Sequence, residues 1–254
     1  MKKIFSILIL LFLFSGVGFG QRDSGKNAKQ KPIILISIEG GIGIPVGGFS
    51  GTTDNTGSSN FSGVHAINGE TININFSKSI NRMLSFVGRL NFNTNYYEDP
   101  GCTPNGIDYI PEYDQGSTSF QEYGALFGIM LSANTKPAID LRLLIGADRY
   151  TSPEIKYYAY GYGYLLSQST VDIHSIQGNA LAFDFGCTTR FQISKRLFIP
   201  LDFDFYYSAY HYSINYTVTY NYQSPSTTIN YYTSQKWFIP VSVFNITTGI
   251  GFKF

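Results

Sequence analysis

Apolar and polar residues alternate over most of the chain. Between residues 33 and 47, Ile34, Ile36 and Ile38 share one face of an extended segment, while Ser37 and Glu39 share the other. A period of two with one apolar face predicts a β-strand. Eight segments follow this pattern, at residues 33–47, 64–77, 83–97, 120–132, 139–150, 179–193, 197–209 and in a last segment that includes 244–254.

The connections between these segments differ in length. Three are short, at 78–82, 133–138 and 194–196, and four are long, at 48–63, 98–119, 151–178 and 210–237. Short turns on one side and long loops on the other are typical of bacterial outer-membrane barrels, and an even strand number leaves both termini on the turn side. The sequence therefore predicts an all-β, transmembrane, antiparallel up-and-down β-barrel of eight strands. We expect short periplasmic turns, long extracellular hairpin loops, and a location in the cell outer membrane with both termini periplasmic.

Charged residues identify which strand face points into the barrel. Nearly all of the strand charges lie in the polar phase, together with many glycines. A water-soluble barrel would place the apolar phase inside and leave those glycines on the solvent face, where they serve no purpose. In lipid the polar phase fills a narrow interior instead, and the glycines make room for the charged groups. The predicted lumen charge network consists of Glu39, Arg89, Glu122, Asp140, Arg142, Asp148, Asp184, Arg190, Asp202, Asp204 and Lys253, and the predicted inward glycines are Gly41, Gly43, Gly124, Gly128, Gly146, Gly186, Gly249 and Gly251.

These lumen charges require partners, because an unpaired buried charge costs several kcal/mol. The set contains four cations and seven carboxylates, so some acids must rely on Asn, Thr, Tyr or water. We expect Arg142 and Arg190, on neighbouring strands near the periplasmic end, to meet Asp140 and Asp202. The favoured interpretation is structural: the charges close the lumen. The alternative is a selective path for ions, in a narrow pore or carrier for small solutes.

The N-terminal region has the features of a secretory signal. Lys2 and Lys3 precede an apolar run at residues 4–14, and Gly18 and Gly20 place small residues before a cleavage site. The run is too short to span a bilayer. The residue directly after the cleavage site is Gln21 and not Cys, so a lipid anchor is not expected. We predict a signal peptide at 1–20, a polar periplasmic linker at 21–31 and the barrel domain at 32–254.

The overall charge argues against one class of partner, and a change in strand pattern marks the predicted outer membrane boundary. A net charge of +1 with 14% charged residues argues against nucleic-acid binding. Apolar odd positions end near 207–209, and beyond His211 the even positions carry tyrosines instead. This switch places the outer membrane boundary there and predicts that the long loops are extended hairpins. Tyrosines at 158, 160, 162 and 164 form a similar column, and Tyr with Ser, Gly and Asn is typical of binding loops.

Sequence signals for catalysis are sparse. Phosphate loops, zinc-ligand spacings and nucleophile elbows are absent, and no metal or cofactor is predicted. His211 and Ser213 resemble the His-x-Ser of some outer-membrane lipases and lipid A deacylases, but no acid follows Asp204 to orient the imidazole. Asn215, Asn221, Asn230 or a more distant acid would have to serve, and a solvated strand face is the simpler interpretation. Pairing of Cys102 with Cys187 is not favoured, and His65 and His174 are expected at the surface.

Three stretches of the chain carry a family resemblance. They are the signal ending at Gly20 and Gln21, the opening strand at residues 40–50 and the final strand at 249–254. They resemble the small outer-membrane β-barrel proteins of Bacteroidota. The resemblance implies that Phe252 and Phe254 form the signal read by the barrel-assembly machinery. We expect a non-enzymatic, monomeric barrel in outer-membrane lipid whose loops serve surface binding or envelope structure through an unknown extracellular ligand. A pore and a lipid hydrolase using His211 and Ser213 are the alternatives.

Overall fold

The structure, a computed structural model, describes residues 32–50, 66–97, 108–111, 119–133, 135–160, 166–173, 175–223 and 226–254. The predicted signal peptide and linker, together with His65, Cys102 and His174, lie outside the described residues. Nearly all described residues are in strands. The elements are β1 (Ile34–Pro45), the 3₁₀ helix η1 (Gly47–Phe49), β2 (Ala66–Ser79), β3 (Leu84–Tyr97), β4 (Asp108–Pro111), β5 (Ser119–Ala133), β6 (Ala138–Thr151), β7 (Ile155–Tyr160), β8 (Leu166–Ile173), β9 (Gln177–Gln192), β10 (Leu197–Gln223) and β11 (Ser226–Lys253).

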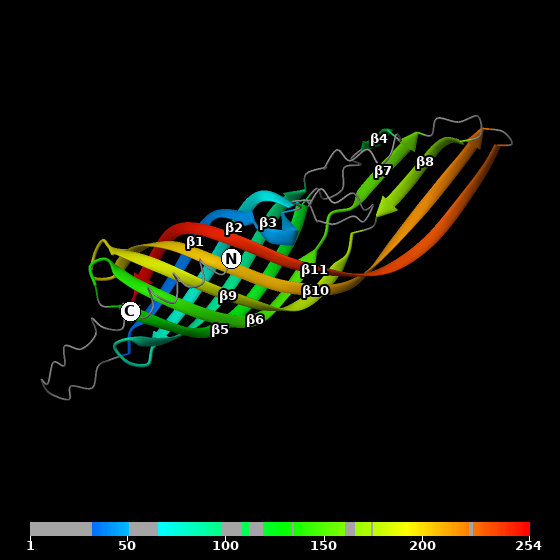
Figure 1. Ribbon diagram of the computed structural model, residues 1–254. Helices are drawn as coiled ribbons and strands as arrows, with labels where there is room; N and C mark the ends of the chain where they lie inside the picture. Colours follow the sequence, from blue (N-terminus) through cyan, green and yellow to red (C-terminus); the bar gives the residue numbers. More distant parts are fainter. Residues whose placement is uncertain are drawn as a thin grey trace, which may run out of the picture. The chain divides into compact units, whose positions relative to one another are not determined.

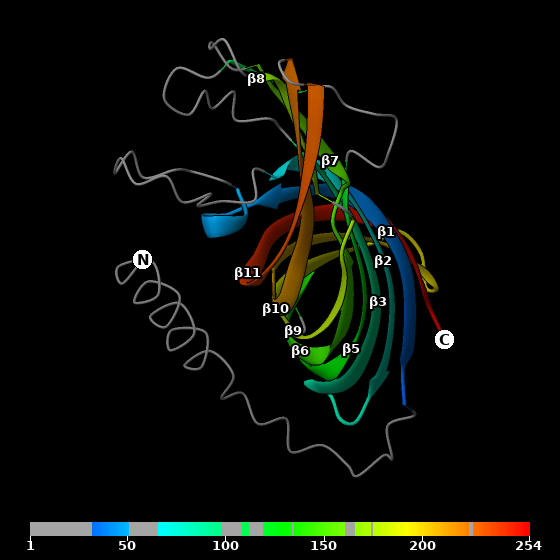
Figure 2. The same cartoon turned by 90° about the vertical axis from the view of Figure 1, so that its right-hand side faces the viewer.

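Eight of these strands close into a barrel. The wall runs β1-β2-β3-β5-β6-β9-β10-β11, and β11 pairs with β1 to complete the circle (Figures 1 and 2). Every neighbouring pair is antiparallel. Closure gives each wall strand a partner on both sides, which a strand in lipid needs because lipid satisfies no backbone hydrogen bond. The predicted eight-stranded, up-and-down barrel is confirmed.

The two ends of the barrel differ. Three short connections, near residues 80–83, 135–137 and 193–196, lie at the end where β1 begins and β11 finishes, with Leu35 opposite Lys253. We call this the turn end. The opposite end, which carries η1 and the long connections, is the loop end. The arrangement of short and long connections therefore follows the sequence pattern.

At the loop end several strands continue past the wall. β9 pairs with β10 as far as Ser208, yet β10 and β11 continue to pair up to Gln223 and Ser226 (Figure 1). β8 then pairs with the upper part of β10, β7 with β8, and β4 with β7. The result is a five-stranded sheet in the order β11-β10-β8-β7-β4, beyond the wall. The expectation of an extended hairpin at 210–237 is confirmed for the backbone, and the segment 151–178 also contains the β7–β8 hairpin.

Side chains alternate between the two faces of the wall. Leu90, Phe127 and Leu143 point outward and are more than half exposed, at 57%, 57% and 56%. Asn93 and Asp202 point inward and are fully buried. The exterior is thus apolar and the interior polar, the inverse of a water-soluble barrel. None of the described helices is long and apolar enough to cross a membrane.

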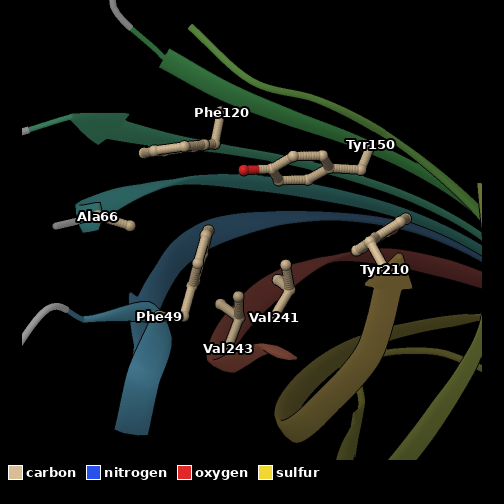
Figure 3. Packing of buried hydrophobic residues seen from close by; sticks show 7 residues of the cluster. All are labelled: Phe49, Ala66, Phe120, Tyr150, Tyr210, Val241 and Val243. Carbon is tan, nitrogen blue, oxygen red and sulfur yellow. The ribbon is translucent and has the colours of Figure 1, made fainter. Parts of the chain in front are cut away.

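The interior also contains apolar side chains that the sequence analysis did not place there. One cluster lies within the wall and consists of Val87, Leu126, Met130, Leu144, Ala182 and Tyr206. A second cluster closes the loop end and consists of Phe49, Ala66, Phe120, Tyr150, Tyr210, Val241 and Val243 (Figure 3). An eight-stranded lumen is just wide enough to be filled by side chains, and apolar groups fill it without needing partners.

Candidate functional site

Two arginines and three aspartates meet in the middle of the lumen. Arg89 on β3 lies 2.6 Å from Asp184 of β9, and 2.7 and 3.0 Å from Asp204 and Asp202 of β10. Arg142 on β6 lies 2.7 Å from Asp202 and also contacts Asp204. All five side chains are at most 4% exposed. We call these five residues the ion-pair network; it ties β3, β6, β9 and β10 together across the lumen.

Polar neighbours complete this network. Asn75 of β2 accepts a hydrogen bond from Arg89 Nε at 2.7 Å and donates one to Glu39 at 2.8 Å. Glu39 also accepts hydrogen bonds from Ser37 and Thr247. Arg142 donates to Thr188 Oγ1 at 2.5 Å. Asn75 therefore extends the connection from β3 to β1, so the polar contacts reach around most of the wall.

A further ion pair lies at the turn end. Arg190 Nε is 2.5 Å from Asp140, and the guanidinium lies over the ring of Phe198 at 5.9 Å. The ring fills the space beside Gly251, where a Cβ atom would come within 2.2 Å of it. Lys253 also follows the inward phase, but it is half-buried and makes no ion pair with any described residue. Arg142 with Asp202 and Arg190 with Asp140 are the contacts expected from the sequence.

Glu122 and Asp148 lie nearer the loop end and are separate from the arginines. Both are buried, at 1% and 2% exposure. Asn93 donates to one oxygen of Glu122 at 3.1 Å, and the Tyr210 hydroxyl donates to one oxygen of Asp148. Neither carboxylate forms an ion pair with a described residue. These two acids therefore form a second polar group, separate from the cations of the described residues.

Buried polar and apolar side chains occupy the lumen along the described wall. A cavity of about 30 Å³ lies on the turn-end side, lined by residues that include Glu39, Arg142, Arg190 and Phe198. That volume suits one or two water molecules and no larger solute. The loop end is closed by Phe49, whose ring meets Phe120 edge-on at 5.4 Å between centroids (Figure 3).

Gly186 shows how closely the ion-pair network fits its wall. A Cβ atom there would lie 1.8 Å from Asp204 Oδ1 and 3.1 Å from Arg142 Nε. We expect Gly186→Ala to lower the free energy of unfolding by about 1–3 kcal/mol, because the added methyl group would push Asp204 and Arg142 out of place. Urea unfolding of protein refolded in lipid vesicles measures this. Gly88→Ala is the control, since no atom lies within 4 Å of its Cβ position. Equal losses in the two variants would contradict the close fit.

Sequence reasoning missed several polar participants. Asn75, Thr188, Tyr206 and Tyr210 all contribute to the lumen contacts or clusters, yet none was in the predicted network. Each lies in the same phase as charged neighbours; Tyr206, for example, follows Asp202 and Asp204 at steps of two. The position of these residues on the inward face was the signal that could have identified them. They were left out because the predicted network was selected by charge, and all four are neutral.

The remaining predicted site residues are placed as follows. His211 is exposed on β10, and the backbone of Ser213 follows two residues later, while the Ser213 side chain lies outside the described part. Cys187 is a free, half-buried thiol, and its suggested partner Cys102 is not described. Among the residues that the structure describes, no group of three or more His, Cys, Asp or Glu could hold a metal ion. Phe252 on β11 and Phe254, directly after that strand, are both exposed.

Comparisons with known proteins show a similarity in fold alone. No protein-family model and no curated protein matches the chain. It is similar to Ail, the attachment invasion locus protein of Yersinia pestis, at 14% identity over 88% of this chain and 97% of that one, with a TM-score of 0.39. A major outer membrane protein from Thermus thermophilus matches at 12% identity over 87% and 99%, with a TM-score of 0.43. The outer membrane protein AlkL, solved in DMPC bilayers, matches at 11% over 91% and 96%, with a TM-score of 0.31.

Proposed function

We propose that this chain is a non-enzymatic outer-membrane β-barrel whose sealed lumen is structural and whose loop-end sheet binds a partner outside the cell. The observation that carries the proposal is the contrast between the two parts of the molecule. The lumen is filled by the ion-pair network and by two apolar clusters. Beyond it, β10 and β11 continue well past their neighbours and support three further strands. A filled lumen beneath an extended sheet fits a protein that binds a partner at its surface better than one that conducts solutes.

The exterior of the wall supports a location in lipid. Outward positions from all eight wall strands carry exposed Ile, Leu or Phe side chains, such as Ile38, Phe127 and Leu143. Apolar outward bands of this kind face acyl chains in outer-membrane barrels. With short turns on the periplasmic side, as such barrels have them, both termini are periplasmic and the loop-end sheet is extracellular.

A charge placed on this exterior tests the membrane orientation. We expect Phe127→Arg to lower the free energy of unfolding in lipid vesicles by about 2–4 kcal/mol, because the guanidinium would lie in hydrocarbon. Ile80→Arg, in the turn after β2 and 64% exposed, is the matched control and should cost only about 0–1 kcal/mol near the interface. Urea unfolding monitored by fluorescence gives both values. Equal, small costs would show that Phe127 faces water.

The loop-end sheet supports the binding role by its composition. Of the chain's 20 tyrosines, five lie in residues 151–178 and six in residues 211–237. Tyr, accompanied by Ser, Gly and Asn, supplies large contact area at low entropic cost and adaptable hydrogen bonds. The ligand class stays open between protein, glycan and another cell surface.

The hairpin register allows the upper part of the β10–β11 hairpin, which supports the other strands of the loop-end sheet, to be removed without touching the wall. Gln223 and Ser226 pair across two residues, and His211 pairs with Phe238 twelve pairs lower, so this lower pair has the same hydrogen-bonding type. Joining His211 to Phe238 by Asn-Gly should therefore give a native-like hairpin. We expect the shortened protein to refold as a barrel and to lose binding to whichever host or envelope component in a panel binds the full chain. Retained binding would place recognition elsewhere.

Conductance separates this proposal from the pore alternative. The full chain in a planar bilayer should carry no steady current, because the ion-pair network and both apolar clusters fill the lumen. A steady current from the unaltered protein would favour a narrow pore or carrier. Lipid hydrolysis abolished by Ser213→Ala would instead favour the hydrolase alternative.

A further inference from the structure

The turn end of the barrel carries an exposed lysine on each of its three hairpins. Lys78 belongs to the β2–β3 hairpin, Lys136 to the β5–β6 hairpin and Lys195 to the β9–β10 hairpin. We call these three residues the rim lysines. The three turns lie at the same end of the barrel (Figure 1), and the remaining wall pair, β11 with β1, carries the chain ends there. The rim lysines are therefore spread around the circumference of the turn end.

An exposed isoleucine lies within three residues of each rim lysine. These isoleucines are Ile80, Ile139 and Ile193, at 64%, 41% and 58% exposure. Lys78 follows Phe76 at a step of two on the outward face of β2, and both side chains are exposed. A lysine buries its apolar stem along such a surface and keeps its ammonium group in the polar layer beside it. This arrangement is expected at the level of lipid headgroups.

Arginines add to the positive charge of these turns. Arg82 and Arg196 are both exposed. Arg196 lies two residues before the buried Phe198, on the inward phase of β10, so it belongs to the mouth of the lumen rather than to the outer face. The rim lysines are therefore the residues that best fit a contact with the surrounding bilayer.

The positive charge of the turn end has no acidic side chain to balance it among the described residues. The three short connections contain no Asp or Glu. Asp140, the acid that β6 carries at this end, is buried and paired with Arg190. None of the rim lysines forms an ion pair with a described residue. The loop end differs, because its exposed charges include both signs, such as Glu70 and Arg149.

We propose that the rim lysines bind the phosphate groups of anionic phospholipids, of the phosphatidylglycerol type, around the turn end. The inference rests on the proposed location of the wall in lipid and goes beyond the proposed surface-binding role. The isoleucines beside the lysines favour a lipid surface over a soluble polyanion, because acyl chains cover them. A lipid with net negative charge supplies the counter-charge that the protein lacks. With the turns on the periplasmic side, this lipid lies in the inner leaflet and holds the barrel at a fixed depth.

Electron paramagnetic resonance of spin-labelled lipids tests the inference. The mature chain is refolded in phosphatidylcholine vesicles with a trace of spin-labelled phosphatidylglycerol or phosphatidylcholine, and the motionally restricted signal gives the association of each lipid with the protein. A lysine near an anionic lipid surface contributes about fivefold to binding. Averaged over all contacting lipids, we expect phosphatidylglycerol to be preferred by about twofold or more. The preference should disappear at roughly 1 M salt, where such charges are screened.

Charge-removing variants locate the preference on the protein. Lys78→Gln combined with Lys195→Gln should weaken it, and the further change Lys136→Gln should abolish it. Lys156→Gln combined with Lys236→Gln is the matched control, because it removes two lysines from β7 and β11 beyond the wall and should leave the preference unchanged. Lys78→Arg combined with Lys195→Arg keeps the charge and should keep the preference.

Three results would overturn the inference. One is equal association of the unaltered protein with both lipids at low salt. Another is a preference that salt does not weaken or that survives the loss of all three rim lysines. The third is binding of soluble polyglutamate through the rim lysines without any lipid preference, which would identify a soluble acidic partner. The salt dependence is measured on the unaltered protein, so it does not require the variants to refold. The shortened β10–β11 hairpin tests the loop-end binding role separately.

Discussion

Arg89→Met is expected to lower the free energy of unfolding by about 3–5 kcal/mol, because it leaves buried carboxylates without their cation. Arg89 contacts Asp184, Asp202 and Asp204, and the two aspartates on β10 keep Arg142 as a second partner. Asp184 has an ion pair only with Arg89 among the described residues. The loss should therefore arise mainly at Asp184. Urea unfolding of protein refolded in lipid vesicles gives the value.

A second substitution distinguishes the buried charge from the lost packing. Arg89→Met combined with Asp184→Asn should recover part of the stability, because the uncompensated carboxylate is gone. Arg196→Met, in the exposed turn before β10, is the matched control and should stay within about 0.5 kcal/mol of the unaltered protein. If the double variant were no more stable than Arg89→Met, the network would contribute through shape rather than charge.

Phe49→Ala is expected to cost about 3–5 kcal/mol, the usual range for removing a buried phenylalanine ring. Phe49 is fully buried, and its ring packs with Phe120, Val241 and Val243 at the loop end (Figure 3). The void left behind would lie among the other buried members of this cluster. The barrel should still form, because Phe49 lies on η1 and outside the paired strands. The same urea unfolding experiment measures the change.

The matched control for Phe49 is a phenylalanine on the outer face. Phe127→Ala removes the same ring, but a lipid tail can occupy the space, so the cavity contribution to the loss is absent. We expect it to cost less than half as much as Phe49→Ala. The Phe49→Ala protein should also remain non-conducting, because the ion-pair network still fills the lumen below. A steady current through this variant would show that the apolar cluster alone closes the barrel.

The strand pattern was readable because it is local. Residues two apart share a face of a strand, so Asp202 and Asp204 were assigned to one side and Phe203 and Phe205 to the other before any pairing was known. The segregation of charges and glycines then identified the inner face. Connection lengths predicted the strand order. Cross-strand contacts between neighbours, such as Arg190 with Asp140, followed from the same information.

Contacts between strands on opposite sides of the lumen could not be predicted from the strand pattern. Arg89 meets Asp184 and Asp204, which are 95 and 115 positions away in sequence, because the barrel's diameter and strand stagger bring β3 opposite β9 and β10. The inward apolar residues were missed for a related reason. Val87 and Leu144 share the inward phase with Arg89 and Arg142, but only the closed lumen shows that space remains there for them.

The sequence by itself determined the eight strands, their inner and outer faces and the alternation of turns and loops, since each depends on neighbours along one strand. Only the tertiary structure decided which acids pair with the arginines, that Phe49 closes the loop end, and that Glu122 and Asp148 lie apart from every cation of the described residues. Closure of the barrel sets those distances, and residue spacing within a strand carries no information about the opposite wall.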